Sequence, residues 1–185
     1  SGESKASFVE GLTEANWNNR PHDLWNFADH VSDRFEVPAT WQIIELEHPV
    51  HELIESPILY LATDERFDFP DEQIDRLRGF VEAGGLLLTN AEGANAGPGR
   101  SIHQLARKLF ADQGLKMIKV DGDHPIRHIH AKNVHVPMQM VHNGVRPLMI
   151  HFAKDIGGDL PGGESRFGAL PAGVHYTIVN GEVLV

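Results

Sequence analysis

The residues best placed for chemistry follow an apolar run at Leu86–Leu88, after which the chain reads Thr-Asn-Ala-Glu-Gly-Ala-Asn. In many α/β hydrolases, the turn after a buried strand holds the nucleophile. Here that turn carries Glu92 between small residues, and a carboxylate can act as a general base or as a nucleophile. A hydrolase that uses Glu92 would need Asp155 or His124 within hydrogen-bond reach. The chain has no cysteine, so a thiol nucleophile is excluded.

Other residues near the ends of predicted strands suit ligand binding. Asn90 and Asn95 could orient a ligand through amide hydrogen bonds, or adopt the left-handed backbone that asparagine tolerates in loops. Trp17 could stack on a sugar ring or a peptide side chain, or cover an edge of the sheet. Arg20 could hold a carboxylate or a phosphate with its planar guanidinium, or form a salt bridge to an acidic loop. The candidate ligand-binding residues are therefore Asn16, Trp17, Arg20, Asp64, Asn90, Glu92 and Asn95.

A histidine cluster gives a weaker case for a metal site. In an extended segment His128 and His130 point to the same face, and with Asp123 they could bind zinc. His124 and His135 lie nearby, but the 12 histidines are spread over the whole chain without a compact motif such as His-Glu-x-x-His. The glycines of the stretch 93–99 lack the Lys-Ser/Thr pair of a phosphate loop. We therefore predict no metal and no cofactor.

Composition limits the class of partner. A net charge of −10 argues against binding to nucleic acid and to anionic membranes. No apolar run approaches the roughly 20 residues that span a bilayer. With 185 residues, 41% of them apolar, the chain can form one domain with a substantial core. The expected partner is an unknown small molecule or another protein.

The order of elements predicts the fold that would position these residues. Apolar strands at 57–63, 86–90 and 147–152 alternate with amphipathic helices at 70–83 and 101–112, and earlier strands are expected at 7–13 and 41–46. This alternation predicts a single α/β domain, a three-layer sandwich with a mainly parallel sheet. Residues 161–185 are expected to form a Gly- and Pro-rich loop and a C-terminal hairpin turning at Asn180-Gly181. Ligands of such sheets bind beyond the carboxyl ends of the strands, where the candidate residues fall.

Four segments, in this order, resemble a known family. They are Asn16-Trp17-Asn18-Asn19-Arg20-Pro21-His22, Ile58-Leu59-Tyr60-Leu61 with Phe69 through Leu88, Asp123-His124-Pro125-Ile126, and the weaker Asp155-Ile156-Gly157. Over about residues 7–160 they resemble the uncharacterised bacterial family called domain of unknown function 4159. The resemblance implies a flavodoxin-like fold similar to class I glutamine amidotransferases. Family members often carry cysteine near the turn where this chain has Glu92-Gly93.

The first functional interpretation is a non-catalytic module on an amidotransferase-like fold that binds a ligand or a protein. A hydrolase that uses Glu92 is one alternative. A carbohydrate-binding or carbohydrate-active domain is another, supported by Trp17 beside acidic loops. Because many family members are exported or membrane-tethered, the resemblance favours a periplasmic or envelope location with a signal or anchor removed, and a cytoplasmic location is the alternative.

Overall fold

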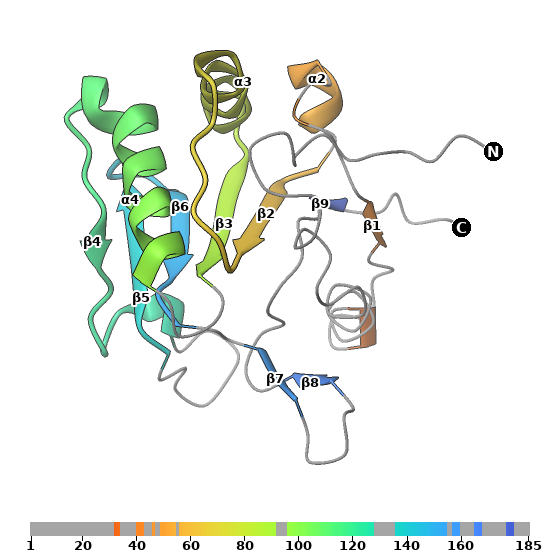
Figure 1. Cartoon of the computed structure of the whole chain (residues 1–185), viewed down its shortest axis with the longest axis vertical. Coiled ribbons are helices and arrows are strands. Elements are labelled where there is room, and N and C mark those ends of the chain that lie inside the picture. Colours follow the sequence, from red (N-terminus) through yellow and green to blue (C-terminus); the bar gives the residue numbers. More distant parts are fainter. Residues whose placement is uncertain are drawn as a thin grey trace.

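A computed structural model gives the architecture of the chain (Figure 1). The structure describes residues 32–33, 40–42, 46, 49–54, 56–91, 96–127, 136–154, 157–159, 165–167 and 177–179. The strand predicted at 7–13 lies outside these residues.

Seven of the described strands form one mixed sheet in the order β1-β9-β2-β3-β6-β5-β4. Their bounds are β1 Thr40–Gln42, β2 Ile58–Thr63, β3 Leu86–Ala91, β4 Ile118–Lys119, β5 Met138–His142, β6 Pro147–Phe152 and β9 Thr177–Val179. The strands predicted at 57–63, 86–90 and 147–152 correspond to β2, β3 and β6. The prediction of an α/β domain is confirmed.

The prediction of a mainly parallel sheet is wrong, because the sheet is only partly parallel. Strand β2 pairs in parallel with β3, and β3 pairs in parallel with β6, whereas β5, β4, β9 and β1 pair antiparallel with their neighbours. Strands β5 and β6 are antiparallel because the connection between them is short. Residues 143–146 form a tight turn, which can join only antiparallel strands. A further two-stranded antiparallel sheet, β7 (Gly157–Asp159) with β8 (Ser165–Phe167), forms where the sequence predicted a loop.

Two long helices follow the two central parallel strands. Helix α3 (Asp71–Glu82) begins after Pro70, carries Asp71 and Glu72 in its first turn, and ends before Gly84, whose φ of 116° favours glycine. Helix α4 (Ala96–Phe110) begins earlier than predicted, because Pro98 fits the first turn of a helix. Three shorter helices are α2 (Val50–Leu53), η2 (Ala111–Gln113) and η3 (Pro125–Arg127).

Helices α3 and α4 cover the same face of the sheet and lie side by side (Figure 1). Right-handed crossovers explain this arrangement, since β2, β3 and β6 follow one another in the sheet. The core on this face joins Leu59 and Leu87 from the strands to Phe80 of α3 and Ile102 of α4. We call it the helix face.

The opposite face carries a smaller apolar cluster, built around Met138, Met140, Ile150 and Phe152. Ile126 of η3 packs against it, whereas neither α3 nor α4 contributes to it. The structure thus describes a helix layer and a sheet layer, and the third layer of the predicted sandwich stays a prediction. No helix among the described residues is long and apolar enough to cross a membrane.

Candidate functional site

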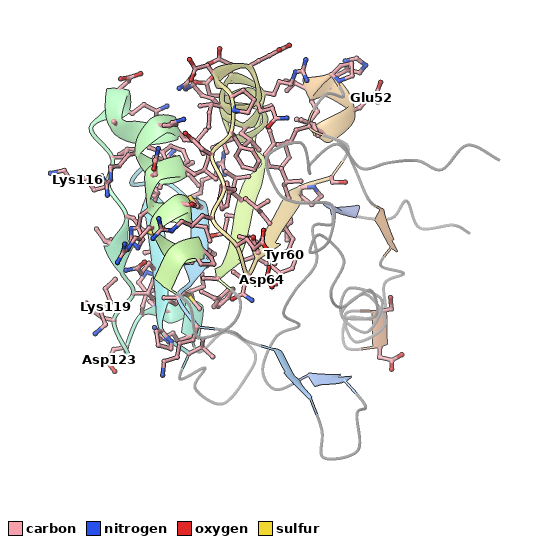
Figure 2. All side chains as sticks on the ribbon, in the orientation of Figure 1. Glu52, Tyr60, Asp64, Lys116, Lys119 and Asp123 are labelled. Carbon is pink, nitrogen blue, oxygen red and sulfur yellow. The ribbon has the colours of Figure 1, made fainter. Side chains whose placement is uncertain are left out.

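The carboxyl ends of β2 and β3 bring two of the predicted site residues to one edge of the sheet. Ala62 is the register partner of Asn90, and Thr63 is the partner of Ala91. Asp64 directly follows β2 and lies at the end of that strand in Figure 2. Asp64 and Asn90 therefore occupy the same edge, as the sequence predicts.

Hydrogen bonds and an ion pair hold the loop after β2 in place. The hydroxyl of Thr63 accepts a hydrogen bond from the amide of Glu65 and donates one to its carbonyl oxygen, each at 3.1 Å. The amide of Phe67 donates to the hydroxyl of Ser101 on α4 at 3.0 Å. Further along, the Lys108 ammonium lies 2.6 Å from the Asp68 carboxylate. The loop is thus fixed to α4, which gives this edge a defined shape.

Asn90 is the most unusual residue at this edge. Its side chain is 0% exposed, yet neither its amide nitrogen nor its amide oxygen has a hydrogen-bond partner among the described residues. It shares the face opposite the helices with Leu88 and with its register partner Phe152. More than nine in ten buried polar groups in proteins find partners, so an unpaired buried amide calls for an explanation.

The other predicted site residues divide into two groups. His124 lies in the turn before η3, where its Nδ1 accepts a hydrogen bond from the amide of Ile126 at 3.2 Å. Strand β4, which this turn follows, is separated from β3 by β6 and β5 in the sheet. The residues Asn16, Trp17, Arg20, Glu92, Asn95 and Asp155 lie outside the described part of the chain, so the structure does not place them.

The histidine cluster of the sequence is only partly described. His128, His130 and His135 lie outside the described residues. Within the described part of the chain, no group of three or more His, Cys, Asp or Glu side chains could hold a metal ion. The segment around His124 has a structural role instead. Arg127, 6% exposed, donates hydrogen bonds to the carbonyl oxygens of Asp121, Val120 and Val136 at 2.9 to 3.0 Å.

Sequence reasoning missed a polar pair on the helix face. His151 of β6 is 1% exposed, and its Nδ1 lies 3.1 Å from the hydroxyl oxygen of its register partner Thr89. The ring of His103 on α4 stands edge-on to that of His151, with centroids 5.9 Å apart. The sequence signal for this polar pair was a histidine inside the apolar run 147–152. The residues that this histidine contacts depend on strand register, which the sequence alone does not give.

The environment of His151 fixes its charge. Burial, and then the charge of nearby His103, lowers the pKa of His151 from 6.5 to about 4, although a hydrogen bond with the Thr89 backbone acts in the opposite direction. His151 is therefore neutral at neutral pH.

Hydrogen bonding also assigns the tautomer of this neutral ring. The Thr89 hydroxyl donates its one hydrogen to the carbonyl oxygen of Ile150 at 3.3 Å. Its oxygen is then left to accept from Nδ1–H of His151. This arrangement favours the tautomer with the His151 proton on Nδ1 and with Nε2 as an acceptor.

Comparison with known families identifies the domain. The model of the family described as "Domain of unknown function (DUF4159)" matches residues 7–158. The chain belongs to this family. A search among curated proteins found no match. The DUF4159 region contains Asn90, His103 and His151, whereas β8 and β9 lie beyond it.

Proposed function

We propose that this DUF4159 domain is a non-catalytic ligand-binding module on an amidotransferase-like fold, with its site at the carboxyl edge over β2 and β3. The observation that carries the proposal is the buried amide of Asn90, which has no hydrogen-bond partner among the described residues. Its position supports a ligand role, because α/β sheets bind their ligands at the carboxyl ends of the strands.

The energetics favour a ligand over simple packing. A buried polar group without a partner costs about 1–3 kcal/mol, so an apolar residue at position 90 would stabilise the fold better. A ligand that pairs with the amide would recover this cost on binding. Because Asn90 offers both a donor and an acceptor, the matching group is one that also offers both, such as a primary amide or the edge of a nucleobase.

The amidotransferase-like fold and the absence of catalysis each have one support. Strand β2, helix α3, strand β3 and helix α4 follow one another in the chain, and the resemblance expects a reactive residue between β3 and α4. The chain has no cysteine to form a thioester with glutamine, which favours binding over amide transfer.

The experiment compares two variants that each remove a buried, unpaired polar group. Asn90→Leu removes it at the carboxyl edge. Ser56→Ala removes it just before the start of β2, because the Ser56 hydroxyl is 0% exposed and also lacks a partner among the described residues. Position 62, the register partner of 90, is six residues further along, which is about 20 Å in a strand. Ser56→Ala is thus a matched control far from the site.

Both variants and the wild type would be tested against glutamine, asparagine, nicotinamide and adenine, by thermal shift and titration calorimetry. The proposal expects at least one of them to bind the wild type and Ser56→Ala equally, and to bind Asn90→Leu at least about tenfold more weakly. Equal binding by Asn90→Leu, or binding by none of the three proteins, would refute the proposed site. Release of ammonia from glutamine by the purified wild type would refute the non-catalytic part.

The hydrolase and carbohydrate interpretations stay predictions. Their principal residues, Glu92 and Trp17, lie outside the described residues, and no described contact favours either interpretation. The envelope location likewise stays a prediction from the family resemblance.

A further inference from the structure

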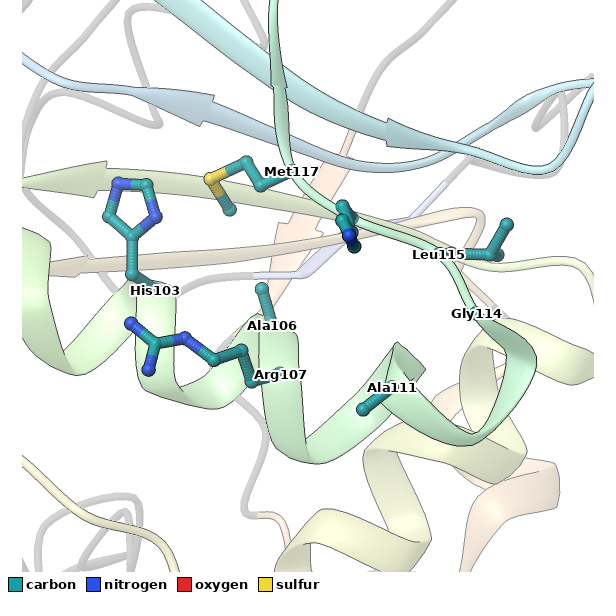
Figure 3. Close-up of a pocket in the computed structure, with 8 residues that line it drawn as sticks. His103, Ala106, Arg107, Ala111, Gly114, Leu115 and Met117 are labelled. Carbon is teal, nitrogen blue, oxygen red and sulfur yellow. The ribbon is translucent and has the colours of Figure 1, made fainter.

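A hollow lies on the helix side of the sheet, between α4 and the segment that leads into β4 (Figure 3). Its volume is about 410 Å³. The space exists because small residues line it, among them Ala106 and Ala111. Gly114 contributes in the same way: its φ is 69°, and a Cβ built there would meet no atom within 4 Å. The cavity is separate from the edge that holds Asn90, because that residue points to the opposite face.

Two cationic side chains line this cavity from different segments. Arg107 projects from α4, and Lys116 comes from the segment that faces the helix. Neither has a carboxylate within ion-pair distance among the described residues, although the next residue on the helix, Lys108, pairs with Asp68 at 2.6 Å. The chain as a whole carries a net charge of −10. In an acidic protein, two cationic side chains that lack a carboxylate partner among the described residues favour the binding of an anion between them.

The inner end of the cavity is polar and leads into the sheet. His103 lines the cavity and packs edge-on against the buried His151, which in turn contacts Thr89. Gln139 is the direct cross-strand neighbour of His151, and its side-chain oxygen is buried without a partner among the described residues. Hydrogen-bonding groups of the sheet therefore lie next to His103.

The remaining wall is apolar. Met117 and Leu115 are partly buried and pack against the main core, and Ala106 is 5% exposed. Figure 3 shows Met117 and His103 on the sheet side of the cavity, and Arg107 on α4 one turn from His103. A ligand with an anionic group at Arg107 and Lys116 could place an apolar body against Met117.

We propose that this cavity binds a small organic anion, in which a carboxylate or phosphate is attached to a short apolar body. The volume lies at the lower end of the range for small-molecule pockets, roughly 300–1,000 Å³. Arg107 and Lys116 bind the anionic group, Met117 and Leu115 contact the apolar body, and His103 closes the inner end. The proposal does not depend on the ligand site at Asn90.

The test uses four probes of similar size that differ in charge. Phenyl phosphate and benzoate are anionic, benzyl alcohol is neutral, and benzylamine is cationic. Binding would be measured on the full chain by titration calorimetry, and the site would be located by amide chemical-shift changes. We expect at least one of the two anions to bind at micromolar to millimolar concentration, more weakly as salt is raised, with shifts confined to residues around 103–117. A comparison of the affinities for phenyl phosphate and for benzoate shows whether the cavity prefers phosphate or carboxylate.

Variants assign the binding to individual side chains. Arg107→Ala should weaken binding of the anion by roughly tenfold or more, since it removes a charge-assisted hydrogen bond. Arg66→Ala, which removes the same charge from an exposed loop residue outside the cavity, should leave the affinity unchanged. Ala106→Leu should block the cavity. If that buried substitution prevents folding, Ala111→Leu fills the same cavity from an exposed position.

Three results would overturn the proposal. The first is the absence of binding by both anions at millimolar concentration. The second is equal affinity for benzylamine, since a cationic wall must discriminate by charge. The third is an Arg107→Ala variant that binds as tightly as the wild type.

Discussion

Burial of His151 couples the stability of this fold to pH in a defined direction. Its pKa is lowered by burial first and by His103 second, from 6.5 to about 4, so the folded protein favours the neutral ring. Between these two values the unfolded chain binds a proton at this residue and the folded chain does not. The contribution of His151 to stability is therefore fully present above about pH 6.5 and is lost as the pH falls towards 4.

The size of the effect follows from the same two pKa values. A difference between 6.5 and about 4 corresponds to about 3 kcal/mol of unfolding free energy. Because His151 is only 1% exposed, solvent screening does little to reduce this figure. That is a large share of the roughly 5–15 kcal/mol that stabilises a typical domain.

The assay compares the wild type with His151→Gln by urea denaturation at pH values between about 4 and 7. Glutamine is neutral throughout and keeps a polar atom for Thr89. The 26 aspartates and glutamates also titrate in acid, but they are common to both proteins, so the difference between the two curves isolates His151. We expect the wild type to lose about 3 kcal/mol more than the variant across this range.

The control is His51→Gln, which removes a histidine whose side chain is 75% exposed. The unfolding free energy of this variant should change with pH at the same slope as that of the wild type. Parallel curves for the wild type and His151→Gln would refute the reasoning, as would a wild type that gains stability from this residue as the pH falls.

Three further substitutions test the packing that holds the two sites. Gly85→Ala should cost about 1–3 kcal/mol in urea denaturation, because a Cβ at Gly85 would overlap the buried ring of Phe80, and an unchanged midpoint would contradict this. Gly99→Ala in α4 should instead add up to about 1 kcal/mol, because its Cβ meets nothing within 4 Å, and a loss of stability would show that this position is not open. Arg127→Met should cost about 2–4 kcal/mol, since three carbonyl oxygens lose their donor; a thermal midpoint equal to that of the wild type would show that the Arg127 contacts contribute nothing.

The sequence predicts the central elements well where local signals agree. Strands β2, β3 and β6 are apolar runs bounded by turn residues, and α3 carries a regular apolar stripe between Pro70 and Gly84. These signals are local, because they depend on side-chain periodicity and on the backbone preferences of proline and glycine. The structure accordingly confirms all four elements.

Strand direction could not be predicted in the same way. An apolar run has no direction, so β6 was expected to belong to a mainly parallel sheet, and its antiparallel neighbour β5 was not predicted at all. The decisive signal was the turn between them. The Asn143 side-chain oxygen accepts from the amides of Val145 and Arg146, and Gly144 has a φ of 92°. Such a turn forms a hairpin, which leaves no room for a crossover.

The candidate site shows the same limit. The position of Asn90 at the carboxyl edge follows from its place after an apolar run, and the sequence predicts it. That neither of its amide atoms has a partner among the described residues depends on the residues across the sheet, which the sequence does not place. The contact between His103 and His151 depends further on how α4 lies over β6.

Strand β3 places a satisfied and an unsatisfied polar residue next to each other. Thr89 and Asn90 are consecutive, so their side chains point to opposite faces of the sheet, and both are 0% exposed. Thr89 contacts His151 and the Ile150 carbonyl oxygen, and its burial therefore needs no ligand. Asn90 has no such partner among the described residues. The two neighbouring polar residues thus differ in whether their burial is compensated by hydrogen bonds. Of the two, only the burial of Asn90 leaves an unfavourable free energy that a bound molecule would remove.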